Sequence, residues 1–388
     1  MKYGSYRNTW AEVSLDAISH NVRAFKKYIG NKQTKLMAVV KADGYGHGSI
    51  EVAKAAIEAG ADYLAVALLD EALLLRQAGI HFPLLVLGYT GADGAEAAVE
   101  HDIALTVFTK SELKKVEQVA KQKKKQARIH LKIETGMNRI GLGNSAEVLD
   151  MVKAISPDYV KIEGAFTHFA DADNTDVSYT RKQFKRFREI IQELEAKGIS
   201  IPIKHCCNTA GTIQFPEMHL DMVRVGIGLY GLYPSEHLRK KITLLQAMSL
   251  KTKPVLIKTV EAGEPISYGC TFTPKEKSMI ATIPIGYADG ISRLLSNRGE
   301  VIAGGKRAPI VGRICMDQSM IDITHIQDID VTDTITIFGE PSEGYIYMGE
   351  LADLIGTIHY EMACLIGKRV PRVYKKDGKV IKEKSLLT

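Results

Sequence analysis

Apolar residues recur in the first two-thirds of the chain as eight short runs, separated by longer stretches with helical periodicity. The runs are rich in β-branched residues and have the length of buried strands. They lie at residues 36–40, 63–66, 84–87, 104–108, 129–133, 160–166, 203–207 and 222–225. Strands that alternate with amphipathic helices indicate parallel βαβ units. Eight such units in about 225 residues predict an α/β fold, a closed (β/α)₈ barrel of the TIM type.

The first helix is predicted between Ser14, a possible N-cap, and Gly30, a C-terminal stop. An open, doubly wound sheet is the alternative to a closed barrel. The sequence contains no Gly-x-Gly-x-x-Gly after a strand, and the stretch GYGHG at residues 44–48 does not match that motif. The barrel is therefore the preferred interpretation.

After residue 241 the pattern changes to β-rich segments punctuated by Gly and Pro. We predict two domains, a barrel at residues 1–241 and a mostly β C-terminal domain at 242–388. The first twelve or so residues are expected to pack with the second domain. One helix is predicted over 348–367, and a hairpin over 372–383 with a two-residue turn at Asp377-Gly378.

The net charge of +6 is too small and too dispersed for a nucleic-acid-binding surface. No apolar run approaches the roughly 20 residues needed to span a bilayer, and the N-terminus lacks the apolar core of a signal peptide. The five cysteines include no Cys-x-x-Cys pair, which argues against a disulfide framework or a zinc site. We expect a cytoplasmic protein without a membrane or nucleic-acid partner and without a bound metal.

Charged and polar residues follow the predicted strands. Lys41 follows the first strand, Arg139 comes after the fifth and His168 after the sixth, and Arg224 lies in the eighth. In a barrel these strand ends meet at one mouth, where chemistry is usually found. Their positive charges would repel one another unless an anionic ligand neutralises them.

The ends of strands seven and eight are the usual phosphate position in such barrels. Thr209 offers a hydroxyl there, and Gly226 and Ile227 offer backbone N–H groups. A lysine in a dry pocket, such as Lys41, is pushed toward its neutral, nucleophilic form. A neutral lysine opposite a phosphorylated cofactor suggests a Schiff base with pyridoxal 5'-phosphate.

Nine motifs occur in order across both predicted domains: AVVKADGYGHG, HLKIETGMNRIG, FTHFADAD, HCCNTAG, MVRVGIGLYG, PISYG, GYADG, VGRICMDQSM and HYEMACLIGKRVPR. This set resembles that of bacterial alanine racemases. The resemblance implies a pyridoxal-phosphate-dependent isomerase that interconverts L- and D-alanine and supplies D-alanine for cell-wall peptidoglycan. It also implies a head-to-tail homodimer with shared active sites.

By this resemblance, Lys41 holds the cofactor and acts as one of two bases. Tyr268 is the second base and serves the opposite face of the substrate Cα. Tyr45 contacts the phosphate, and Arg224 faces the pyridine nitrogen of the cofactor. His205 hydrogen-bonds Arg224 from the neighbouring strand.

Arg139 is expected to bind the phenolic oxygen of the cofactor and the substrate carboxylate, with help from the Met316 N–H of the partner chain. The other residues expected near the site, by the same resemblance, are His168 against the cofactor ring or orienting its loop, Asn208 beside the phosphate, Tyr360 and Tyr287 at the phosphate or the entrance, and Cys315 and Asp317 on the substrate side.

Lys132 points inward on the fifth predicted strand, seven residues before Arg139. The matching lysine carries a carbamate in some alanine racemases, and we expect Lys132 either to be carbamylated or to bind a small anion. Thr209 departs from the family pattern, which often has serine there, but keeps the hydroxyl. Two alternatives are a non-enzymatic pyridoxal-phosphate homeostasis protein and a barrel-type amino-acid decarboxylase.

Overall fold

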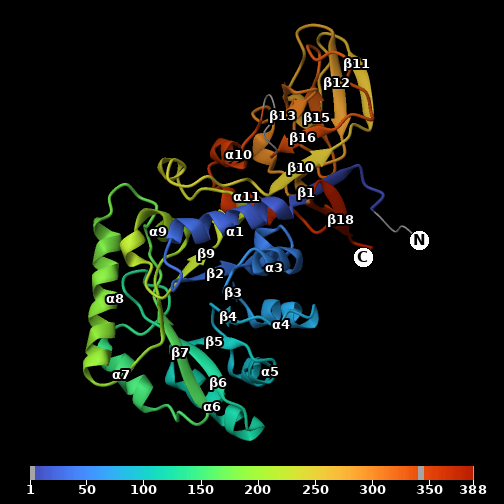
Figure 1. The fold of residues 1–388 in the computed structure, drawn as a ribbon. Helices are drawn as coiled ribbons and strands as arrows, with labels where there is room; N and C mark the ends of the chain where they lie inside the picture. The colour runs from blue at the N-terminus through green and yellow to red at the C-terminus, as the bar shows by residue number, and fades with distance from the viewer. Residues whose placement is uncertain (1–4, 340–344, 388) are drawn as a thin grey trace. The chain divides into compact units, whose positions relative to one another are not determined.

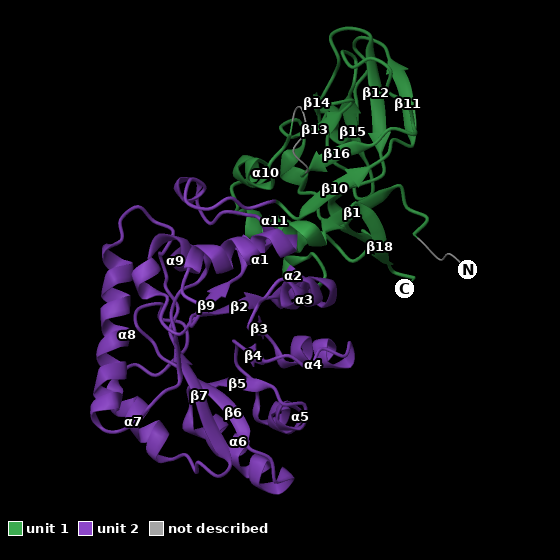
Figure 2. Ribbon diagram, viewed as in Figure 1, with its two compact units in different colours: residues 1–17, 45–48, 246–388 green, residues 18–44, 49–245 purple. Residues whose placement is uncertain are grey.

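The structure is a computed structural model that describes residues 5–339 and 345–387. The chain divides into two compact units (Figure 2). The barrel unit comprises residues 18–44 and 49–245, and the β unit comprises residues 1–17, 45–48 and 246–388. Among the described residues, no helix combines the length and the apolar character needed to cross a membrane.

Eight parallel strands form the sheet of the barrel unit, in the order β8-β7-β6-β5-β4-β3-β2-β9. Their bounds are β2 Lys35–Val39, β3 Tyr63–Val66, β4 Leu84–Val86, β5 Ala104–Val107, β6 Ala127–Lys132, β7 Val160–Phe166, β8 Ile203–His205 and β9 Met222–Val225. Two backbone hydrogen bonds join the edge strands β8 and β9. The Arg224 N–H donates to the Cys207 carbonyl at 3.0 Å, and the Asp221 N–H donates to the Lys204 carbonyl at 3.1 Å. The sheet is thus a nearly closed barrel, which confirms the predicted fold.

Helices alternate with these strands and lie outside the sheet (Figure 1). The helices are α1 Leu15–Ile29, α3 Ser49–Glu58, α4 Leu69–Gln77, α5 Ala95–Glu100, α6 Lys110–Lys123, α7 Ser145–Lys153, α8 Ser178–Ala196 and α9 Thr209–Gln214, and the segment α2 Lys41–Tyr45 is a left-handed turn. Every residue of β3, β4 and β5 is buried, as expected for parallel strands covered on both faces. The predicted N-cap of α1 is confirmed, since the Ala17 N–H donates to Ser14 Oγ at 3.1 Å.

The β unit contains a seven-stranded sheet in the order β14-β13-β16-β10-β1-β17-β18 and a three-stranded sheet β11-β12-β15. The N-terminal strand β1 pairs antiparallel with β10 and parallel with β17. The strands are β1 Thr9–Ser14, β10 Met248–Thr252, β11 Leu256–Val260, β12 Ser278–Ile283, β13 Glu300–Ala303, β14 Lys306–Pro309, β15 Ser319–Asp322, β16 Ile335–Phe338, β17 Arg372–Lys376 and β18 Lys379–Lys384.

The predicted single helix over 348–367 is wrong, because the structure has two helices there, α10 Met348–Ile355 and α11 His359–Leu365. Gly356 caps α10 in the left-handed conformation, at φ 73°, and this ends the helix. The predicted hairpin is confirmed, with Asp377 and Gly378 both at positive φ between β17 and β18.

Short 3₁₀ turns complete the secondary structure. They are η1 Ala92–Gly94, η2 Pro216–Met218, η3 Ile227–Tyr230, η4 Glu236–Leu238, η5 Tyr268–Cys270, η6 Tyr287–Asp289 and η7 Arg293–Leu295.

Candidate active site

Lys41 stands at the start of a left-handed turn that directly follows β2. Ala42, Asp43, Gly44 and Tyr45 have φ values of 52°, 50°, 62° and 51°. Left-handed backbone costs a non-glycine residue roughly 1–2 kcal/mol. Strain of this kind persists only where the surroundings enforce it, and it concentrates at functional sites.

Two carboxylates hold this turn in place. Glu71 accepts the Ala42 N–H at 2.6 Å with one oxygen and the Ala67 and Leu68 N–H groups at 2.8 and 3.2 Å with the other. Asp43 accepts the Ser49 N–H at 2.9 Å, at the start of α3. The backbone beside Lys41 is therefore tied to the loop after β3 and to the next helix.

Arg224 is buried in β9, and its guanidinium is held by groups from two strand ends, those of β7 and β8. Nη1 donates to His205 Nδ1 at 3.0 Å, and Nη2 donates to the carbonyls of Thr167 and Cys206 at 2.8 and 3.0 Å. Nη2 also lies 3.2 Å from His168 Nδ1. Burial lowers the pKa of Arg224 to about 10, so that the group stays charged at neutral pH.

The cations predicted at the strand ends act together on His168. Burial lowers the pKa of His168 well below its usual range, and the nearby charges of Arg224, Arg139, Lys132 and Lys41 lower it further. His168 is consequently a neutral ring in positively charged surroundings. An anionic ligand would relieve this repulsion.

Lys132 is only 2% exposed and lies over the Phe166 ring, 5.4 Å from its centroid. Its ammonium donates to the Ile133 carbonyl at 3.0 Å. Burial, followed by the charge of Arg224, lowers the pKa of Lys132 to about 7. A large neutral fraction of this amine is therefore expected near pH 7.

Thr209 and the turn after β9 form a small cradle. Thr209 Oγ1 accepts the Gly226 N–H at 3.0 Å and the Gly228 N–H at 3.4 Å. A Cβ at Gly228 would lie 2.6 Å from the Phe25 ring and 2.8 Å from the Thr209 methyl, so that only glycine fits. Within the described part of the chain the Ile227 N–H has no hydrogen-bond partner. Asn208 uses its side-chain oxygen to cap α9, accepting the Gly211 N–H at 2.9 Å.

Arg139 is exposed on a loop that folds around the Glu134 carboxylate. This carboxylate accepts the backbone N–H groups of Gly136 and, at 3.3 Å, Arg139. Burial alone would raise the pKa of Glu134, but donation by the backbone of Asn138, Gly136 and Arg139 outweighs burial and lowers it. An ionised carboxylate thus shapes the loop that carries Arg139.

Tyr45, Gly46, His47 and Gly48 belong to the β unit by their contacts. The Tyr45 ring lies 6.5 Å from the Tyr360 ring of α11, and the two rings are tilted by 54°. Both tyrosines were predicted from the sequence as cofactor-binding residues, and within the β unit they are neighbours.

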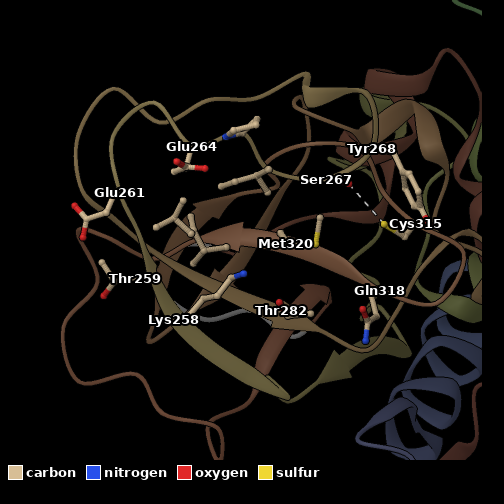
Figure 3. A pocket seen from close by; sticks show the side chains of 14 residues that line it. Lys258, Thr259, Glu261, Glu264, Ser267, Tyr268, Thr282, Cys315, Gln318 and Met320 are labelled. Carbon is tan, nitrogen blue, oxygen red and sulfur yellow. Dashed lines mark hydrogen bonds between the residues drawn. The ribbon is translucent and has the colours of Figure 1, made fainter.

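Tyr268 projects from a strained turn of the β unit and is 72% exposed. Ser267, which precedes it, has φ 69° and ψ −178°, a region occupied almost only by glycine. The Ser267 hydroxyl donates to the Arg313 carbonyl at 2.6 Å and lies 3.6 Å from Cys315 Sγ. Figure 3 shows Ser267, Tyr268 and Cys315 along one side of a surface hollow of about 700 Å³.

The strain at Ser267 can be measured with a matched pair of variants. Ser267→Ala and Ser267→Gly both lose the hydroxyl, but only alanine keeps the Cβ that disfavours this conformation. We expect Ser267→Gly to be more stable than Ser267→Ala by about 1 kcal/mol in chemical denaturation, despite the flexibility of glycine in the unfolded chain. Equal stability of the two variants would contradict strain at this position.

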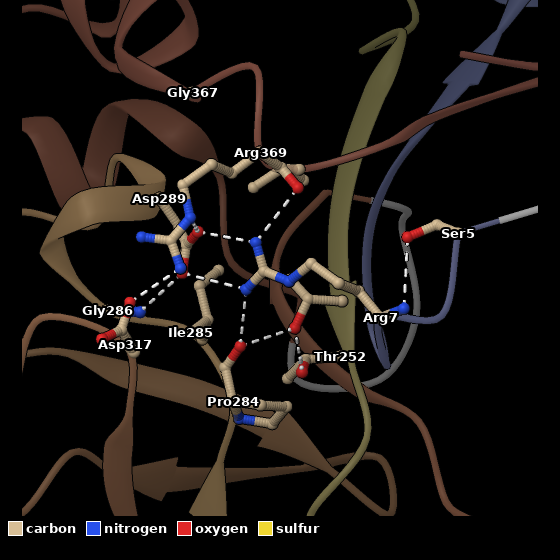
Figure 4. A network of polar contacts seen from close by, with 12 residues as sticks. Ser5, Arg7, Thr252, Pro284, Ile285, Gly286, Asp289, Asp317, Gly367 and Arg369 are labelled. Atoms are coloured by element: carbon tan, nitrogen blue, oxygen red, sulfur yellow. Dashed lines mark hydrogen bonds and ion pairs between the residues drawn. The ribbon is translucent and has the colours of Figure 1, made fainter. Parts of the chain in front are cut away.

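Asp289 is fully buried, and Arg369 joins its loop to the loop of Asp317 (Figure 4). Arg7 binds its carboxylate in a bidentate manner at 2.7 and 3.1 Å. Arg369 lies 3.5 Å from Asp289 and donates to Asp317 at 2.7 Å. A bidentate arginine–carboxylate pair fixes orientation as well as distance.

Glycine is required where these two loops meet. The Tyr287 and Ala288 N–H groups donate to the carbonyls of Cys315 and Met316, both at 3.0 Å. A Cβ at Gly286 would clash with the carbonyl oxygen of Cys315. The Met316 N–H has no hydrogen-bond partner among the described residues, and the residue is 53% exposed.

Sequence reasoning missed several residues that support the predicted ones. Glu71 stands three residues after the N-cap of α4, but that N-cap is Leu68, whose side chain cannot accept a hydrogen bond, so the sequence shows no capping box there. Asp289 stands within the quoted motif GYADG, but its partners Arg7 and Arg369 are remote in sequence. Nothing in the sequence pairs His130 with His205, which lies 75 positions away.

Comparison of the sequence with known proteins identifies the family of the protein. Residues 13–234 match the family described as alanine racemase, N-terminal domain, and residues 247–374 match alanine racemase, C-terminal domain. An alanine racemase of Oceanobacillus iheyensis is 64% identical over 100% of this chain and 98% of its own length.

Solved structures agree with the sequence matches. The alanine racemase of Bacillus anthracis with bound L-Ala-P aligns at a TM-score of 0.93, with 41% identity over 99% of both chains. A histidine racemase of Leuconostoc mesenteroides aligns at 0.88, with 31% identity over 97% of this chain and 100% of its own. The chain, which matches both family domains, belongs to the alanine racemase family, as its motifs predicted.

Proposed function

We propose that the protein is a racemase that uses pyridoxal 5'-phosphate to interconvert L- and D-alanine, with Lys41 and Tyr268 as its two bases. The observation that carries the proposal is that Arg224 and Arg139 place positive charge around a neutral His168 at the strand ends, where Lys41 also acts on it. Positive charge concentrated in this way calls for an anionic ligand. Membership of the alanine racemase family, whose enzymes depend on this cofactor, gives that ligand a chemical class.

The residues present fit such a cofactor. The unpartnered Ile227 N–H, Gly226 and the Thr209 hydroxyl would hold the phosphate, together with Tyr45. Within the described chain, Arg224 Nε has no hydrogen-bond partner and could face the pyridine nitrogen. The Lys41 amine would hold the cofactor through its aldehyde carbon. When bound, the cofactor withdraws electrons from the amino acid and makes its Cα–H bond acidic.

Racemisation requires proton removal from one face of Cα and proton return to the other. Lys41 Nζ, at the end of β2, would exchange the proton on one face, and the Tyr268 hydroxyl would exchange it on the other. Arg224 cannot act as a base because guanidinium does not give up its proton in proteins. It would instead keep the pyridine nitrogen unprotonated, which limits electron withdrawal and disfavours transamination.

The substrate carboxylate would be bound by Arg139 and by the unpartnered Met316 N–H. Tyr268, Met316 and Tyr287 are 72%, 53% and 43% exposed. Large apolar side chains exposed in one region of a β unit are typical of a surface that a partner covers. We therefore propose a homodimer in which Tyr268 and Met316 complete the active site of the partner, with Asp317 and Cys315 behind them.

Alanine is the proposed substrate because the relatives cited above are alanine racemases, and one of them was solved with L-Ala-P. The histidine racemase of similar fold shows that the architecture also serves a larger amino acid in another protein. We further propose that the enzyme acts in the cytoplasm and supplies D-alanine for peptidoglycan. The division at residues 241 and 242 is retained as the proposed domain boundary.

Solvent exchange tests this function directly. Incubating the cofactor-loaded protein with L-alanine in D₂O is expected to produce D-alanine together with deuterium at Cα. Measuring kcat/KM for alanine, serine and histidine in parallel is expected to favour alanine. Recovery of unlabelled L-alanine as the sole product would overturn the proposal, and release of CO₂ would show a decarboxylase instead.

Lys132 is proposed to carry a carbamate that pairs with Arg139. A neutral amine is needed to attack CO₂, and the lowered pKa of about 7 leaves Lys132 mostly neutral at pH 8 and mostly protonated at pH 6. The expected result is a ¹³C carbamate signal that is strong at pH 8 and weak at pH 6 after incubation with ¹³C-bicarbonate. The Lys132→Met variant should lack the signal. Its persistence in that variant would assign it to another lysine.

A further inference from the structure

Arg224 is the first of a series of hydrogen-bonded, buried side chains that continues through His205 to His130. Arg224 Nη1 lies 3.0 Å from His205 Nδ1, and His205 Nε2 lies 2.9 Å from His130 Nδ1. Both histidines are fully buried. A Cβ at Gly164 would lie 2.6 Å from His130 Nδ1, so β7 has a glycine where the His130 ring needs room.

The donors and acceptors in this series of side chains allow one arrangement of protons. The Arg224 guanidinium can only donate, so His205 Nδ1 must accept. A neutral His205 then carries its proton on Nε2 and donates it to His130 Nδ1. His130 must in turn carry its proton on Nε2. Burial lowers the pKa of both rings, which agrees with two neutral imidazoles.

The proton on His130 Nε2 faces Glu163 on β7. The Nε2–Oε2 distance is 3.4 Å, which is long for a hydrogen bond, and His130 Nε2 has no other partner among the described residues. The Tyr63 hydroxyl donates to the same carboxylate oxygen at 2.7 Å, and Arg128 lies 3.4 Å from the other oxygen. Burial alone would raise the pKa of Glu163, but its donors lower it to about 2.

We propose that His130 and Glu163 are positioning residues for Arg224: through His205 they fix the proton order of the series and hold the guanidinium in one orientation. A negative charge at the far end favours protons that all point toward it. The series therefore opposes any state in which His205 turns a proton toward Arg224. The guanidinium keeps its charge although, among the described residues, its hydrogen-bond partners are imidazoles and carbonyls and not carboxylates.

The catalytic consequence rests on the proposed function. Loss of these hydrogen-bonded side chains would leave Arg224 free to reorient, and protonation of the cofactor nitrogen would no longer be opposed. The side reaction that this favours is transamination, in which the amino group of alanine stays on the cofactor and pyruvate is released. The expected signature is therefore a change in the ratio of products as well as a slower reaction.

Proton order can be read without any catalysis. Nitrogen-15 NMR of the histidine-labelled protein, with signals assigned by their loss in His130→Phe and His205→Phe, distinguishes Nε2–H from Nδ1–H rings. We expect both rings to carry the proton on Nε2 in the wild-type protein. A proton on Nδ1 of either ring would overturn the proposal, whether or not the protein racemises alanine.

The kinetic arm compares His130→Phe with Tyr63→Phe. Both substitutions remove a polar neighbour of Glu163, but only His130 belongs to the series of hydrogen-bonded side chains that leads to Arg224. We expect His130→Phe to bind the cofactor, to lower kcat about tenfold with KM nearly unchanged, and to release more pyruvate per racemisation event. Tyr63→Phe is expected to leave the pyruvate ratio at the wild-type value. Equal pyruvate ratios in the two variants would overturn the proposal, and a wild-type protein that does not racemise alanine would instead overturn the proposed function.

Discussion

The Lys41→Ala variant is expected to lose racemisation by at least about a thousandfold and to lose the visible absorbance of covalently held cofactor at the same time. The reason is positional, since Lys41 follows β2 directly and its backbone is fixed by the left-handed turn and by Glu71. Absorbance spectra and an enantiomer-specific assay measure the two losses.

The Lys132→Met variant is the matched control for this prediction. Lys132 is a second lysine near the strand ends, but it is buried and its ammonium is directed to the Ile133 carbonyl. The Lys132→Met variant should keep the covalent cofactor and part of the activity. A yellow, active Lys41→Ala protein would show that another residue holds the cofactor.

The Tyr268→Phe variant is expected to retain the cofactor but to exchange the Cα proton unequally in the two enantiomers. Removal of one phenolic oxygen eliminates the base on one face and leaves Lys41 on the other. Exchange from L-alanine should fall by about 10²- to 10⁴-fold, the usual contribution of a general base, and exchange from D-alanine much less. Deuterium incorporation into each enantiomer, measured before products accumulate, gives the two rates.

The Tyr287→Phe variant controls for the loss of an exposed tyrosine from the same unit, because Tyr287 is 43% exposed and is not assigned as a base. It should affect both enantiomers to a similar, small extent. Symmetrical and mild losses in Tyr268→Phe would show that the tyrosine is not a second base.

The barrel was predictable because each of its strands is a short apolar run bounded by helical sequence. Observed strands such as β3 and β9 match their predicted bounds at both ends. The break between α10 and α11 was missed because the apolar periodicity continues across Gly356, whose left-handed conformation ends the helix. A glycine within a periodic stretch is compatible with either outcome.

The residues proposed for direct chemistry were predictable because they follow strands or stand in short motifs, as Lys41, Arg224 and Tyr268 do. Their supports were not predictable. Glu71 reaches back 29 positions to Ala42, and Arg7 reaches 282 positions to Asp289. Such partners are brought together by the fold alone, and no local pattern reports them.

Borohydride reduction followed by peptide mass spectrometry tests the central claim, the attachment of the cofactor to Lys41, most directly. Reduction of the cofactor-loaded protein makes that attachment permanent, and digestion then locates the added mass. The predicted result is one modified peptide, containing Lys41. Modification of the peptide that contains Lys132, or of no lysine at all, would contradict the account.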